Sequence, residues 1–144
     1  MTGSDVDQIK RIQQHLIDAD GVSGVLLASW QVFELVRAVT GDNADQASDM
    51  YPAFTFARGA AVSGRNAIAY APSLPADCAP WPDTPAPVAG DVYEVADAVA
   101  ELASVLSGRL RETAGLAADP GDRVACEKAA SAAARISRLL AKGE

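Results

Sequence analysis

The chain has 144 residues, of which 49% are hydrophobic but only 6% are aromatic, and its two cysteines are too few for a disulfide scaffold. This is the size of one ordinary domain, large enough to bury a core without disulfide or metal staples, so we expect a single domain over residues 1–144. The formal net charge of −7 disfavours nucleic acid and anionic membrane surfaces as partners.

The first two predicted helices are separated by a glycine. Ser4 or Asp5 can cap a helix whose apolar residues recur at spacings of three and four, and we expect it to end near Gly21, which accepts a left-handed backbone. Ser23 is expected to cap a second helix that ends at Gly41. Because this second helix is apolar nearly all round, it is predicted to be central in the fold.

A third helix is predicted from Ser48 or Asp49 to about Tyr70, with a proline in its first turn. Two neighbouring apolar stripes run along it, one through Phe54 and one through Phe56. We expect both stripes to be buried.

Two glycines, Gly59 and Gly64, lie inside this third helix. A glycine costs about 1 kcal/mol relative to alanine in a helix interior. The presence of each glycine inside the helix therefore needs an explanation, and the simplest is that another backbone approaches closely at that position.

A proline-rich connector follows at residues 71–90, and residues 71–91 hold six of the chain's eight prolines. A connector of this length without secondary structure is uncommon in a compact domain unless it is functional or docked. We interpret it as a rigid strap, docked in part through Trp81, and a disordered tether or a recognition arm is the alternative. Because an extended strap can cross the whole molecule, the helices on either side of it need not be neighbours or antiparallel.

Two more helices are predicted after the connector. The fourth begins at Asp91, which fits a capping box with Glu94, and ends near Gly115. Its valines and leucines form a continuous seam at three-four spacing. The last helix begins at Asp119 and Pro120 and continues to the C-terminus, with a narrow alanine-rich face.

These elements predict an all-α fold, because no strand or hairpin pattern appears beside them. We expect an antiparallel helical bundle of four main helices, with a long proline-rich crossover between helices three and four.

Catalytic and metal-binding side chains are scarce. His15 is the only histidine, which excludes two-histidine metal sites and leaves serine or cysteine nucleophiles without a convincing base. Cys78 and Cys126 lie in different elements without a histidine nearby, so no zinc site is expected, and the pattern leaves a disulfide between them open. We therefore predict a protein that is not an enzyme and has no metal or cofactor.

Cys126 lies near the start of the last helix, where the helix dipole could lower the pKa of an exposed thiol. A small packed residue is the alternative. The sequence begins without a signal-peptide pattern, and we count no apolar run of the roughly 18 residues that a membrane span requires. We expect a cytoplasmic protein with reduced thiols.

A small set of polar residues could bind a ligand. Arg58 and Arg65 share one face of the third helix, and with Asn66 they could clamp a carboxylate or phosphate in a pocket between helices two and three that Trp30 also lines. The alternative is that these arginines pair with an acid at the edge of the core, such as Glu34.

The charge is unevenly distributed, since residues 1–107 carry five basic and fourteen acidic side chains whereas residues 108–144 carry seven and five. The last helix has a basic face that could bind an acidic partner. Its residues are Lys128, Arg135, Arg138 and Lys142.

The favoured function is a protein–protein interaction module that forms a homodimer through its two C-terminal helices, or that binds another protein. The alternative is a helical sensor of a small anion or carboxylate, with its pocket between helices two and three.

Overall fold

Five α-helices make up the secondary structure of the part of the chain that the structure describes. The computed structural model describes residues 5–44, 48–75 and 91–141, and no strand occurs among them. The helices are α1 (Asp5–Asp18), α2 (Gly21–Asn43), α3 (Tyr51–Ala69), α4 (Val92–Leu116) and α5 (Pro120–Leu140). The all-α prediction is confirmed, but the number of main helices is five and not four, because α1 buries its own apolar face in the common core.

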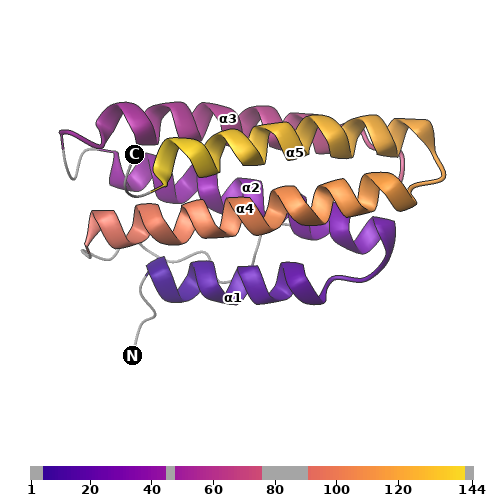
Figure 1. Ribbon diagram of the computed structural model, residues 1–144, viewed down its shortest axis with the longest axis horizontal. Coiled ribbons are helices and arrows are strands. Elements are labelled where there is room, and N and C mark those ends of the chain that lie inside the picture. Colours follow the sequence, from indigo (N-terminus) through magenta and orange to yellow (C-terminus); the bar gives the residue numbers. More distant parts are fainter. Residues whose placement is uncertain (1–4, 45–47, 76–90, 142–144) are drawn as a thin grey trace.

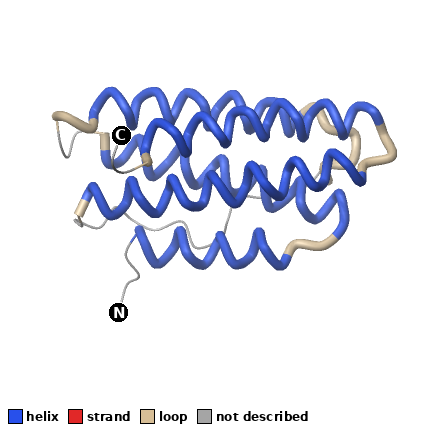
Figure 2. Tube along the Cα trace, viewed as in Figure 1, coloured by secondary structure: helices blue, strands red, loops and turns tan. Residues whose placement is uncertain are grey.

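The helices lie side by side along one long axis (Figure 1, Figure 2). Four of them form a ring in which α2 packs on α3, α3 on α5, α5 on α4 and α4 on α2, and α1 packs against both α2 and α4. Neighbours in this ring run in opposite directions, whereas α3 and α4 run the same way (Figure 1). Helices three and four are therefore parallel and stand diagonally across the ring, as the crossover allows.

The chain must pass from one end of the molecule to the other between the end of α3 and the start of α4 (Figure 1). Most of the predicted strap, including Trp81, lies at residues 76–90, outside the described residues. Its first residues are docked, since Ala71 is buried and Leu74 packs against the core, whereas docking through Trp81 stays a prediction.

Side-chain caps begin the last two helices where the sequence places them. The Asp91 carboxylate accepts from the backbone N–H of Tyr93, and that of Asp119 accepts from the N–H of Gly121. Pro120 opens α5, and α3 begins at Tyr51, close to the predicted start. The first residues of α4 and α5 are thus determined by the capping residues that precede them in the sequence.

The junction of α1 and α2 differs from the prediction. Gly21 has the expected positive φ, +74°, but α2 begins at this residue and Ser23 is not its cap. The Ser23 hydroxyl lies in the first turn of α2 and donates to the carbonyl of Ser73, at 2.9 Å. Asp20 takes the N-cap position, although its side chain makes no capping hydrogen bond, and the helix continues past Gly41 to Asn43.

The turn after α3 is fixed to the start of α5 by a buried carboxylate. Asp122 is 2% exposed, and it accepts from the backbone N–H of Ser73 at 2.9 Å and from the Ser73 hydroxyl at 2.6 Å. We call these contacts the Ser73–Asp122 clamp. Because both carboxylate oxygens are satisfied, the clamp holds the α3–α5 end of the molecule together.

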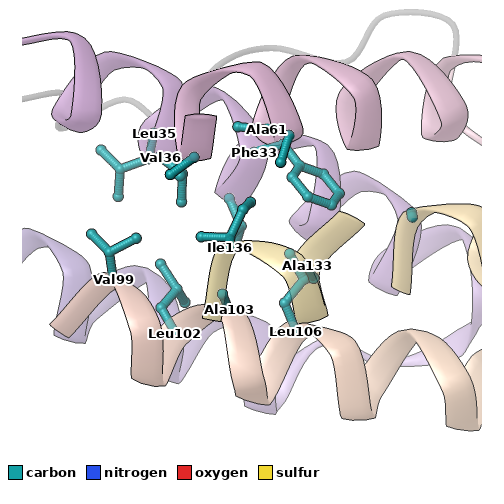
Figure 3. Close-up of a cluster of buried hydrophobic side chains, with 14 of the residues drawn as sticks. Phe33, Leu35, Val36, Ala61, Val99, Leu102, Ala103, Leu106, Ala133 and Ile136 are labelled. Carbon is teal, nitrogen blue, oxygen red and sulfur yellow. The ribbon is translucent and has the colours of Figure 1, made fainter. Parts of the chain in front are cut away.

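The core consists of aliphatic and small side chains, as the composition predicts. Figure 3 shows a representative cluster that draws on α2, α3, α4 and α5, with Ile136 of α5 close to side chains of the other helices. Helix α1 adds Ile9, Ile12 and Leu16, each at most 1% exposed. Every residue of the predicted α4 seam is buried here: Val92, Val95, Val99, Leu102, Leu106 and Leu110.

Packing within the chain explains why residue 64 is a glycine, although the group that approaches it is an aromatic ring and not a backbone. A side-chain carbon built on Gly64 would overlap the ring of Phe33, which is itself completely buried. Gly59, by contrast, is exposed and has nothing within 4 Å of the place where its side chain would begin.

Helix α2 is more apolar than we expected. Its segment Gly21–Gly41 has a mean hydropathy of 1.4 and is long and apolar enough to cross a membrane, which overturns the expectation that no such stretch exists. The stretch was missed because polar residues interrupt it. Just over half of it, 56%, is buried inside the molecule, as in a core helix of a soluble protein, so its composition does not decide where the protein resides.

Candidate functional site

The predicted arginine site contains an ion-pair cluster between α2 and α3. Arg65 Nη1 lies 2.6 Å from Glu34 Oε2, and Arg37 Nη2 lies 3.0 Å from Glu34 Oε1. Burial raises the pKa of Glu34, but hydrogen bonds from Arg65 and Arg37 and their positive charges together bring it below its ordinary value. The pairing with Glu34, which was the alternative, is therefore present, and it occupies Arg65.

The other members of the predicted site are only partly brought together. Asn66 Oδ1 accepts from Arg65 Nη2 at 3.3 Å. Arg58 precedes Arg65 by about two turns of α3, and its exposed side chain lies against Gly41. Trp30 is half-buried against the core. The two grooves described below both border α4, and neither lies between α2 and α3.

The two C-terminal helices use their apolar faces inside this chain. The α4 seam is buried, and so are Ala125, Ala129 and Ile136 of the α5 face. On the opposite side of α5, Lys128, Arg135 and Arg138 are exposed, as predicted, and Lys142 lies outside the described residues. The apolar faces of α4 and α5 are thus buried inside the chain, and homodimerisation through these two helices stays a prediction that would use their exposed sides.

Helix α3 presents an exposed stripe that carries no charged side chain. We call it the α3 outer stripe, and its residues, all exposed and at three-four spacing, are Pro52, Phe56, Gly59, Ser63, Asn66 and Tyr70. Phe56 is 59% exposed and Tyr70 is 86% exposed. The expected burial of Phe56 is wrong, because its side chain lies on the outer side of α3, although the other residues of its predicted stripe, Ala53, Ala60 and Ala67, are buried or packed against the core.

The sequence contains one signal for this surface. Gly59 was recognised as a residue that needs a reason, but an apolar pattern cannot tell a core stripe from a surface stripe on the same helix. Phe56 was therefore assigned to the core and its exposure was missed.

A groove of about 640 Å³ lies between the start of α2 and the end of α4. We call it the α2–α4 groove, and its lining residues are Asp20, Gly21, Val22, Val25, Arg109, Glu112, Thr113, Gly115 and Leu116. Arg109 Nη2 donates to the carbonyl of Ala19 at 2.6 Å, and Nη1 lies 3.2 Å from Glu112 Oε1. No sequence motif marks the groove, because two helix ends distant in sequence form it.

A smaller groove of about 310 Å³ lies between α1 and α4. It carries acidic residues of α4, and Gln13 Nε2 donates to Glu101 Oε2 across it at 3.0 Å. Within the described part of the chain, no group of three or more histidine, cysteine or acidic side chains could hold a metal ion.

Cys126 is a packed residue and not a reactive thiol. It is fully buried and free of a disulfide. Burial is the main cause that raises the pKa of its thiol to about 11, and the negative charges of Asp122 and Glu127 add to it. These effects outweigh the lowering of the thiol pKa that the helix dipole would produce. Cys78 lies outside the described residues.

The chain has no significant match among protein-family models, curated proteins or solved structures. Its function is therefore argued from the surfaces described above.

Proposed function

We propose that the protein is a helical interaction module that forms a homodimer through the α3 outer stripe. The observation that carries this proposal is that Phe56, 59% exposed, lies on the same face of α3 as Gly59, an exposed glycine in the middle of the helix with no intrachain neighbour that requires it. A residue that weakens the isolated helix by about 1 kcal/mol is explained if a second molecule packs against that position. Gly108 of α4 is equally open, but no exposed aromatic side chain lies beside it on that helix.

The charge of the stripe favours a second copy as the partner. The chain carries a net charge of −7, so most of its surface repels another copy. The stripe contains no charged side chain, which lets two copies meet there without like-charge repulsion.

The shape of the stripe is complementary to itself. Phe56 is a large exposed side chain, and Gly59 and Ser63 leave a shallow surface one and two turns further along the same face. If two copies of α3 cross antiparallel about a two-fold axis, Phe56 of each copy covers the Gly59–Ser63 surface of the other. The pairing is isologous and closes at two chains.

The affinity is expected to be modest. A stable interface buries roughly 1,200–2,000 Å² in total, and one helix stripe supplies only part of that area. We therefore expect dimers that dissociate at micromolar concentrations. The alternative, an anion sensor between α2 and α3, has less support because Glu34 already binds Arg65.

Sedimentation velocity over a range of micromolar concentrations tests the proposal. The unmodified chain should shift from monomer to dimer, whereas Phe56→Glu and Gly59→Leu should remain monomeric with unchanged helical content. Ser131→Glu is the matched control, since it adds the same charge at an exposed position of α5. A chain that is monomeric throughout, or a dimer that Phe56→Glu leaves intact, would refute the proposed interface.

A further inference from the structure

We infer that the α2–α4 groove binds a small ligand with an apolar body and a protonated amine. Its volume of about 640 Å³ lies within the range of roughly 300–1,000 Å³ that small-molecule sites occupy. The site is separate from the α3 outer stripe, so this inference does not depend on the proposed dimer.

The apolar body would lie on valine and leucine side chains. Val25 is buried and Val22 is half-buried, so they offer a preformed apolar floor. Leu116, at the end of α4, is 80% exposed and leaves water when a ligand covers it. Burial of such surface is the main source of affinity for an apolar ligand.

The cation of the groove, Arg109, is engaged by the chain through both terminal nitrogens, while its Nε is buried without a hydrogen-bond partner among the described residues. Arg109 donates to the carbonyl of Ala19 at 2.6 Å and pairs with Glu112 at 3.2 Å. An anionic ligand would therefore have to displace Glu112 and approach a second carboxylate, that of Asp20, in the same lining.

The remaining charge favours a cation. Asp20 is exposed and makes no capping hydrogen bond to α2, and Glu112 has a side chain that is 65% exposed, so both carboxylates are accessible from opposite walls. The carboxyl end of α4 adds partial negative charge. The amino end of α2 acts in the other direction with about half a charge. Because the guanidinium of Arg109 offsets one of the two carboxylates, those of Asp20 and Glu112, the lining carries one net negative charge.

Three probes with the same alkyl chain test the inference: hexylammonium, hexanoate and hexanol, titrated into the full chain and followed by amide chemical shifts. Hexylammonium should shift the amides of residues 20–25 and 109–116 and should bind about tenfold more tightly than hexanoate, a difference expected for a surface lining with one net negative charge. Hexanol should fall between them.

Two double variants then distinguish binding at the α2–α4 groove from a general effect of the net charge of the protein. Asp20→Asn with Glu112→Gln should abolish the preference and even favour hexanoate, because Arg109 then remains as the only charge in the lining. Glu94→Gln with Asp97→Asn makes the same change in net charge at the smaller groove and should leave the preference intact. Hexanoate binding as tightly as hexylammonium, no shifts at these residues, or equal effects of the two double variants would overturn the inference.

Discussion

At the scale of single residues, the two glycines of α3 have opposite surroundings. A methyl group on Gly64 would meet the ring of Phe33, whereas one on Gly59 would meet nothing within 4 Å. We predict that Gly64→Ala lowers the free energy of unfolding by about 1–3 kcal/mol through overpacking, and that Gly59→Ala raises that of the monomer by up to about 1 kcal/mol. Urea denaturation of both variants at low protein concentration measures the difference. Equal effects of the two variants would show that the Phe33 ring moves aside without a loss of stability.

Glu34 makes stability depend on pH. Its pKa is lowered in the folded state from the ordinary 4.5, so its contribution is complete above that value and is lost as the pH falls through the folded pKa. Glu34→Gln should therefore cost about 1 kcal/mol at neutral pH, a discounted figure because Arg37 and Arg65 are 35% and 30% exposed. The cost should shrink on acidification. Denaturation curves at a series of pH values, with Glu112→Gln as the more exposed control, would reveal a constant difference if the ion pair contributes nothing.

Cys126 should be chemically silent while the chain is folded. Its thiol is fully buried and its pKa is raised to about 11, so the reactive thiolate is scarce and inaccessible near neutral pH. In a Cys78→Ser background, a thiol reagent should react with Cys126 only after denaturant is added. Rapid reaction of the native variant would contradict the packing of the first turns of α5.

At the scale of elements, the Ser73–Asp122 clamp connects the turn after α3 to α5. Asp122→Ala removes the acceptor of two hydrogen bonds in a buried place and should lower the free energy of unfolding by about 2–3 kcal/mol. Ser23→Ala removes an exposed hydrogen bond to the same turn and should cost no more than about 1 kcal/mol. Thermal unfolding of the two variants compares them. A similar small loss from both would mean that water replaces the clamp.

The elements that could be predicted from sequence are those whose ends are chemically marked. Asp91, Asp119 and Pro120 are local signals, and the helices that they begin are where the pattern places them. Ser23 failed as a cap because Gly21 set the helix start, and the seam of α4 was read as a dimer surface because periodicity shows that a face is buried without showing by what.

The candidate sites were less predictable than the helices. The Arg65–Glu34 pair was anticipated as an alternative, since both residues belong to neighbouring helices. The α2–α4 groove was not, because it depends on how two helix ends meet in three dimensions. The exposure of Phe56 likewise depends on which sides of α3 are covered by α2 and α5.

At the scale of the whole molecule, the order of helices in the ring differs from their order in the chain. Helix α5 stands between α3 and α4 and packs on both, although α4 follows α3 in sequence. Neighbours within the ring run antiparallel, whereas α1 runs parallel to α4, on which it also packs, and α3 and α4 are parallel and stand across the ring from each other (Figure 1).

This ring order has a consequence for synthesis on the ribosome. Helices α1 to α4 emerge before α5, and during that interval the inner faces of α3 and α4 that α5 will cover are open to water. A nascent chain paused before Pro120 would therefore display alanine, valine and leucine surface that the finished molecule hides. The vulnerable period for aggregation or chaperone capture ends only when the length of α5 has packed in place, and the Ser73–Asp122 clamp can form early in that step because Asp122 belongs to the first turn of the helix.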